Sequence, residues 1–137
     1  MLRVKHIIVV GHYGCGGVKA ALNDLRLGLV DNWLRHIQDV RQKHAAMLAG
    51  CASGEERFDR LCEFNVVEQA LNVCHTTVLR EAWNRGQDVT VHGWVYRLAD
   101  GIVRDTGFSV ASLDEIAASY TAAIARIGAG NGATPAT

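Results

Sequence analysis

The stretch HIIVVGHYGCGGVK, residues 6–19, decides the fold of this chain. Its first half is apolar and β-branched, which predicts a buried strand, and its glycine-rich second half predicts a tight turn that leads into a helix. Proteins of the α/β class keep their functional sites where such strands end, at the carboxyl edge of the sheet. His12 and Cys15 lie in this turn, so we expect both side chains to lie at that edge.

His12 and Cys15 together form a donor pair that suits zinc. Imidazole nitrogen and thiolate sulfur are both common zinc ligands. Cys15 also lies near the start of the expected helix, where the positive end of the helix dipole lowers the pKa of a thiol and favours the thiolate. A tetrahedral site needs more than two ligands, so the pair predicts part of a zinc centre.

A glycine-rich turn between a strand and a helix more commonly binds phosphate. The phosphate-binding motifs fail here in detail. The dinucleotide pattern that begins at Gly14 has Lys19 in place of its third glycine. The Walker spacing of Gly11 and Gly16 has Gly17 where the lysine belongs. The sequence therefore argues against nucleotide binding.

The rest of the chain predicts several helices, a hairpin and a last helix. Residues 89–98 are apolar on both faces, which is typical of a strand in a sheet covered by helices. The dipeptide Asp100-Gly101 is a strong hairpin signal, so residues 102–105 should pair antiparallel with that strand. Two of the expected helices cover residues 17–25 and 76–85. Another is capped by Asp31 or Asn32 and ends before Gly50. Two more begin at capping boxes, formed by Ser53 with Glu56 and by Ser112 with Glu115.

Composition indicates one globular domain. The chain has 137 residues, of which 49% are hydrophobic, and its net charge of zero argues against nucleic acid or an anionic membrane as partner. The longest apolar run, residues 7–10, is too short to span a bilayer, and no signal-peptide pattern opens the chain, so we expect the cytoplasm. We expect the domain over 1–127, and a disordered tail over 128–137 because these residues are rich in Gly, Ala and Thr.

The four cysteines are expected to be reduced in that compartment. Cys62 and Cys74 fall on apolar helical patterns and are expected to be packing residues. Neither belongs to a Cys-x-x-Cys pair, so the sequence predicts no separate structural zinc site.

Several motifs occur in the order in which the β-class carbonic anhydrases carry them. The segment at 11–18, GHYGCGGV, resembles the second zinc-ligand motif of that family, and 92–96, HGWVY, resembles its last core strand. Between them, 32–34, 62–66 and 82–87 resemble the intervening helical segments. The resemblance covers residue 2 to about residue 127, and it is to the bacterial type of the family. It implies an α/β fold, a parallel sheet covered by helices with an antiparallel edge hairpin.

The resemblance also implies what this sequence lacks. Members of the family carry an earlier Cys-x-Asp-x-Arg segment, which supplies a second cysteine ligand and an aspartate that binds zinc or releases it. No such segment occurs in this sequence, so the chain resembles the C-terminal portion of such an enzyme, with N-terminal strands missing. The resemblance implies Zn²⁺ as cofactor, with His12 and Cys15 as two of its ligands.

Tyr96 matches a tyrosine that builds a second, non-catalytic bicarbonate site in some bacterial members of the family. The tryptophan and arginine that accompany it there come from the missing part, so Tyr96 is expected to be a remnant of such a site. Trp94 and His92 alternate with Tyr96 along one face of the expected strand, and we expect Trp94 to pack in the core.

Two classes of function stay open at this point. The first is a zinc-dependent carbonic anhydrase that interconverts carbon dioxide and bicarbonate. Its other ligands would come from a companion polypeptide or from residues before the given start, and the resemblance implies a homodimer or a higher homo-oligomer if the full domain is present. The second is an inert remnant or an interaction module.

Overall fold

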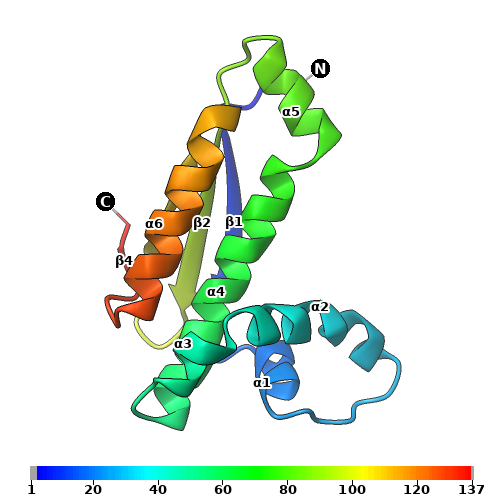
Figure 1. The fold of residues 1–137 in the computed structure, drawn as a ribbon, viewed down its shortest axis with the longest axis vertical. Helices are drawn as coiled ribbons and strands as arrows, with labels where there is room; N and C mark the ends of the chain where they lie inside the picture. Colours follow the sequence, from blue (N-terminus) through cyan, green and yellow to red (C-terminus); the bar gives the residue numbers. More distant parts are fainter. Residues whose placement is uncertain (1–2, 137) are drawn as a thin grey trace.

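The computed structural model describes residues 3–136 and has helices packed against a small sheet (Figure 1). The longest helix, α4, and the last helix, α6, run side by side along the sheet, while α1 and α2 project from one end of it. The elements in chain order are β1 (His6–His12), α1 (Gly16–Leu22), α2 (Val30–Lys43), α3 (Ala45–Ala49), α4 (Gly54–Cys74), α5 (Thr77–Asn84), β2 (Thr90–Arg97), β3 (Ile102–Val110), a 3₁₀ turn (Leu113–Glu115), α6 (Ile116–Gly128) and β4 (Thr134–Pro135).

The sheet has the strand order β1-β2-β3-β4, and only its first pair is parallel. Strand β2 turns back into β3 through the expected hairpin, in which Gly101 has a φ of 69° that favours glycine. The strand after that turn continues to Val110, well beyond the predicted 102–105. The sequence therefore predicted the hairpin correctly and underestimated its length.

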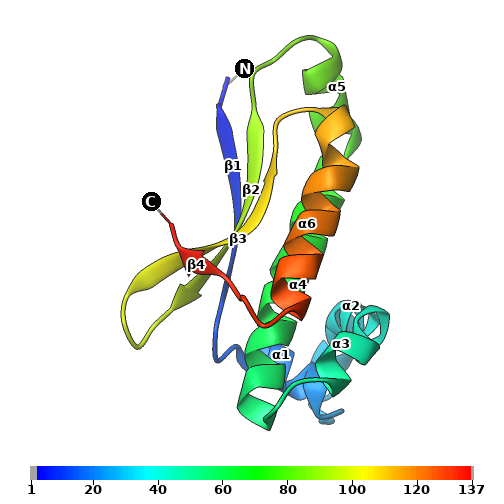
Figure 2. The same ribbon diagram turned by 60° about the vertical axis from the view of Figure 1, so that its left-hand side comes forward.

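Helices cover one face of this sheet, not both. In Figure 2 the strands lie on one side of α4 and α6, and no helix of the described part of the chain lies on the other side of the strands. Exposure alternates accordingly along β1, where Ile8 is 44% and Val10 is 53% exposed while Ile7 and Val9 are half-buried. The predicted α/β fold with helices on the sheet and an antiparallel hairpin is present, and within residues 3–136 the helices lie on one face of the sheet.

The core lies between the sheet and helices α4 and α6. Apolar side chains of β2 and β3 face those of the two helices there, as the two-layer packing of an α/β unit requires. Phe64, Leu61 and Val67 from α4, Val91 and Val95 from β2, Phe108 and Val110 from β3, and Ile127 from α6 are all 2% exposed or less.

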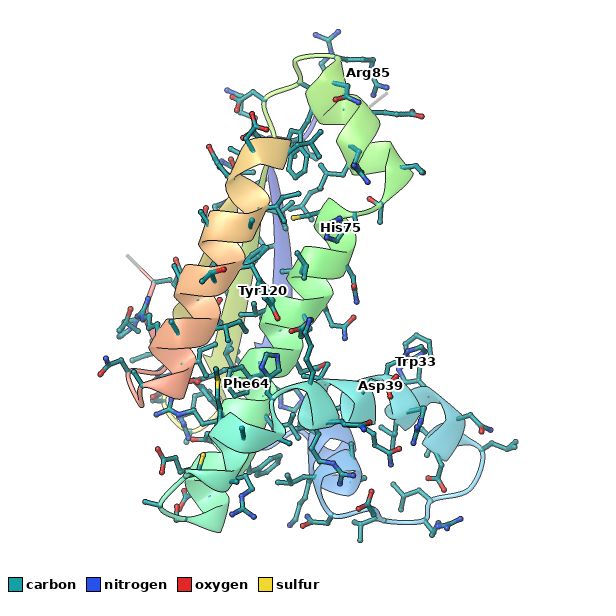
Figure 3. The ribbon with its side chains drawn as sticks, in the orientation of Figure 1. Trp33, Asp39, Phe64, His75, Arg85 and Tyr120 are labelled. Atoms are coloured by element: carbon teal, nitrogen blue, oxygen red, sulfur yellow. The ribbon has the colours of Figure 1, made fainter. Side chains whose placement is uncertain are left out.

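The helix expected to end before Gly50 is divided in two at His44, whose φ of −105° and ψ of 19° interrupt the helical backbone. Leu34, Val40 and Leu48 of this segment are buried. Trp33 is 71% exposed and extends away from the body of the molecule (Figure 3).

The Ser53 half of the capping box before α4 forms as expected, while the Glu56 carboxylate reaches the residue before the N-cap. The Glu56 backbone N–H donates to Ser53 Oγ at 3.1 Å, and the Glu56 carboxylate accepts from the backbone N–H of Ala52 at 2.7 Å. At the second predicted box the Glu115 carboxylate accepts from the Ala111 backbone N–H at 2.8 Å, but Ser112 makes no side-chain cap.

The segment expected to form a disordered tail is placed against the domain as far as it is described. Thr134–Pro135 pairs antiparallel with β3, and the backbone N–H of Ala133 donates to the buried carboxylate of Glu63 at 3.0 Å. Thr137 lies outside the described residues.

All four cysteines are free, and Cys62 and Cys74 are buried as expected of packing residues. Among the described residues, no helix is both long enough and apolar enough to cross a membrane.

Candidate metal centre

His12 ends β1 and Cys15 precedes α1, so the structure places both at the carboxyl end of the first strand. The turn between them is possible because Gly14 has a φ of 74°. Gly11 lets the strand approach α4, because a Cβ atom there would lie 2.5 Å from Val66 Cγ2. The predicted edge position of the pair is therefore observed.

The His12 ring is held through one nitrogen only. Its Nδ1 lies 3.0 Å from the Tyr13 carbonyl oxygen, which accepts the Nδ1 proton and leaves Nε2 as the free lone pair. Metal-binding histidines commonly use one nitrogen in this way to fix the orientation of the other. His12 is exposed, so Nε2 is open to a ligand.

Cys15 occupies the N-cap position of α1, with extended backbone and no side-chain cap hydrogen bond. Its Sγ is therefore not engaged in capping the helix. At the nearby Cys62, burial raises the pKa of the thiol to about 12 despite a hydrogen bond from the Cys15 backbone, and this disfavours the thiolate form. Cys62 thus lies beside the turn without the ionisation that a metal ligand needs.

Tyr13, between the two candidate ligands, anchors the turn to the rest of the fold. Its backbone N–H donates to the Tyr96 carbonyl at 2.9 Å, and its hydroxyl donates to Glu63 Oε1 at 2.5 Å. The Arg97 guanidinium lies 4.1 Å from the centre of the Tyr13 ring, within the range of a cation–π contact. Burial, and then the hydrogen bond to Glu63, raise the pKa of the Tyr13 hydroxyl, so it stays protonated and keeps donating.

Glu63 is the buried partner on which this anchor depends. It is 2% exposed, and besides Tyr13 its carboxylate accepts from Arg60 at 3.0 Å and from the Ala133 backbone N–H at 3.0 Å. A polar cavity of about 390 Å³ opens beside it, lined by Tyr13 and Glu63 and by neither candidate metal ligand. Sequence reasoning missed both anchoring residues, because fifty positions separate them in the chain.

The structure places Tyr96 next to His12, since the two residues are register partners across β1 and β2. Its hydroxyl extends toward the hairpin turn, where a Cβ atom on Gly101 would lie 4.0 Å from it. Within residues 3–136, no group of three or more His, Cys, Asp or Glu side chains is close enough together to hold a metal ion. His12 and Cys15 thus offer donor atoms of the kinds that zinc binds, and a tetrahedral site would need further ligands.

The sequence pattern of the carbonic anhydrase family matches residues 1–103. A carbonic anhydrase of Emericella nidulans is 45% identical over 104 residues, which are 76% of this chain and 46% of that protein. A carbonic anhydrase of Synechocystis is 32% identical over 106 residues, covering 74% of this chain and 38% of that protein. The chain thus spans less than half the length of these relatives.

Solved structures show the same likeness. A Coccomyxa β-carbonic anhydrase, in complex with acetazolamide, superposes with a TM-score of 0.77 and 36% identity over 84% of this chain and 52% of that one. A tetrameric β-carbonic anhydrase from Sordaria macrospora gives a TM-score of 0.71 and 35% identity over 79% of this chain and 55% of that one. Both the fold and the sequence therefore point to the same family.

Proposed function

Because this chain belongs to the β-carbonic anhydrase family, we propose that it takes part in the reversible hydration of carbon dioxide to bicarbonate, with His12 and Cys15 as two ligands of a zinc ion. The observation that carries the proposal is the state of the His12 ring. Its Nδ1 is bonded to the Tyr13 carbonyl and its Nε2 is exposed, three residues before a cysteine whose side chain caps nothing.

When bound, zinc supplies the Lewis acidity that makes hydroxide available near neutral pH for attack on carbon dioxide. The residues of this chain hold and orient the ion. The Tyr13 carbonyl fixes the tautomer of His12, and the hydrogen bond from Tyr13 to Glu63 fixes the turn that carries both ligands. Glu63 and Tyr13 therefore act as positioning residues, since the Tyr13 hydroxyl and the Glu63 carboxylate are hydrogen-bonded to each other.

The remaining ligands are proposed to come from a strand that pairs with β1. Strand β1 is at one edge of the described sheet and has β2 on one side only, so its other side can accept a strand. A Cys-x-Asp-x-Arg segment in that position, as the family resemblance implies, would bring its cysteine to the same sheet edge as His12 and Cys15. Two protein ligands alone make a weak site.

Cobalt(II) replaces zinc in sites of this kind and reports a bound thiolate by a charge-transfer absorption in the near ultraviolet. We expect the chain to develop this band with excess cobalt, and expect Cys15→Ser and His12→Ala each to abolish it. Cys51→Ser is the matched control, because Cys51 is also half-buried. A band that survives Cys15→Ser, or that disappears in Cys51→Ser, would show that the turn is not the metal site.

The second candidate function is an inert module that keeps the fold without the reaction. One observation favours it for residues 3–136 taken alone, namely the absence of a group of three ligands. Under this hypothesis the cobalt band is absent at any cobalt concentration, whereas the first proposal predicts it at high concentration.

We also propose that the protein forms a homo-oligomer. The Sordaria macrospora neighbour is tetrameric. Where no ligand-bearing strand pairs with β1, the open edge of β1 also offers a surface for self-association. The cytoplasmic location expected from the sequence stays a prediction, as does a role for Tyr96 in binding a second bicarbonate.

A further inference from the structure

His6 and His92 lie together on the face of the sheet that no described helix covers. His6 begins β1, and His92 lies on β2 opposite Ile8, so the two rings are diagonal neighbours across the parallel pair. His6 Nδ1 is 3.1 Å from His92 Nε2, and the ring centroids are 5.3 Å apart. At about 3.3 Å per residue, His6 is about 20 Å along β1 from His12, so this pair is separate from the candidate metal centre.

The distance between the two nitrogens is the distance that a shared metal ion requires. Zinc binds imidazole nitrogen at about 2.0–2.1 Å. Two such bonds at a right angle separate the nitrogens by about 2.9 Å, and at the tetrahedral angle by about 3.3 Å. The observed 3.1 Å falls between these limits. The two nitrogens are therefore already separated as in a chelate, and a metal ion lying to one side of the line between them requires the rings to turn but not the strands to move apart.

The surroundings of His92 are compatible with the tautomer that a metal needs. Ser109 Oγ on β3 lies 3.4 Å from His92 Nδ1, a position from which it can accept the Nδ1 proton and leave the Nε2 lone pair for the ion.

We propose that His6 and His92 form a second metal-binding site, a two-imidazole chelate for a borderline divalent ion such as zinc or nickel. Imidazole suits both ions, and water completes the coordination because the site is exposed. The ion would join the edge strand β1 to β2, and so stabilise the strand that the candidate metal centre depends on. This inference does not rest on the proposed function, because it uses neither His12 nor Cys15.

The test uses the full, untagged chain with His12→Ala and Cys15→Ser, so that ions do not bind at the candidate metal centre. Titration calorimetry with NiCl₂, and separately with ZnCl₂, should then give one ion per chain. His6→Gln or His92→Gln should weaken binding by roughly tenfold or more, since even the partners of metal ligands contribute that much. The matched control is His36→Gln, a single exposed histidine on α2, which should leave the affinity unchanged.

A fluorescence measurement on the same proteins would test the metal site independently. Paramagnetic nickel should quench the emission of Trp94, whose ring centroid is 5.7 Å from that of His92, and His6→Gln should remove the quenching. His6 is exposed at the start of its strand, so His6→Gln is informative even if His92→Gln fails to fold. Unchanged nickel affinity in His6→Gln, or loss of binding in His36→Gln, would overturn the proposal.

Discussion

Glu68 on α4 is buried among three helices, and its replacement by glutamine should change how stability depends on pH. Its Oε1 accepts from His44 Nε2 at 2.7 Å and from the Tyr120 hydroxyl at 2.6 Å, and its Oε2 accepts from Lys43 Nζ at 2.9 Å. Tyr120 extends from α6 toward α4 (Figure 3), and the His44 ring stacks on Phe64 with centroids 4.3 Å apart. One carboxylate therefore joins α2, α4 and α6.

The magnitude follows from the pKa of this group. Burial alone would raise it, but the hydrogen bonds from His44, Tyr120 and Lys43 outweigh burial and lower the pKa from 4.5 to about 2. At about 1.4 kcal/mol per pKa unit, the folded state gains about 3 kcal/mol at pH 7 from keeping Glu68 ionised. Because the folded pKa is the lower one, this stability is present above about pH 4.5 and is lost as the pH falls toward 2, with about 2 kcal/mol lost by pH 3.

Urea unfolding followed by circular dichroism between pH 7 and pH 3 tests this reasoning. At pH 7, Glu68→Gln should lower the free energy of unfolding by about 3 kcal/mol, because it leaves buried donors without their charged acceptor. The difference between the wild type and the variant should then shrink to about 1 kcal/mol at pH 3. Glu81→Gln is the matched control, since that side chain is 70% exposed and should cost little at either pH.

Comparison of the two proteins removes the contributions of other carboxyl groups that titrate in both. Asp100 is one of these, because the Arg104 guanidinium beside it also lowers its pKa to about 2. If the wild type and Glu68→Gln gave parallel curves from pH 7 to pH 3, Glu68 would not be the group that couples protonation to folding.

Three further changes have definite expected outcomes. Gly11→Ala should lower the free energy of unfolding by roughly 1–3 kcal/mol in urea, because the new Cβ would lie 2.5 Å from Val66 Cγ2. An unchanged midpoint of urea unfolding would contradict the close approach of β1 to α4. Tyr13→Phe should lower the free energy of unfolding by about 1–3 kcal/mol in the same assay, because the buried Glu63 loses a hydrogen-bond donor. It should also weaken the cobalt band, because the turn that carries His12 and Cys15 loses its anchor. A loss of stability with an unaltered cobalt affinity would exclude the positioning role. Val10 is an exposed apolar residue of the edge strand β1, and a lysine there should disfavour the pairing of β1 with another chain. Val10→Lys should therefore reduce self-association measured by light scattering. A mass distribution like that of the wild type would show that association does not use β1.

The sequence predicted those parts of the fold that depend on neighbouring residues. The strand at 7–10, the turn at Asp100-Gly101 and the cap at Ser53 all follow from local rules of backbone conformation, and all are present. The position of His12 and Cys15 at the sheet edge follows in the same way, because a strand and a helix on either side fix the turn between them.

Contacts between distant residues could not be predicted in this way. The pairing of Tyr13 with Glu63, and that of His6 with His92, joins positions that no local pattern relates. Which faces of the described sheet the helices cover could not be predicted either, because apolar side chains on both sides of a strand look the same in the sequence whether or not a helix covers them.

The most direct test of the central claim is the stopped-flow rate of carbon dioxide hydration by the zinc-loaded chain, mixed with a fragment that carries the Cys-x-Asp-x-Arg strand of a related β-carbonic anhydrase. If His12 and Cys15 are two ligands of the zinc ion, the mixture should hydrate carbon dioxide well above the background rate. His12→Ala or Cys15→Ser should then return it to background while the fragment still binds. Full activity in the mixture with Cys15→Ser would contradict the claim, and would leave the family resemblance as a statement about the fold alone.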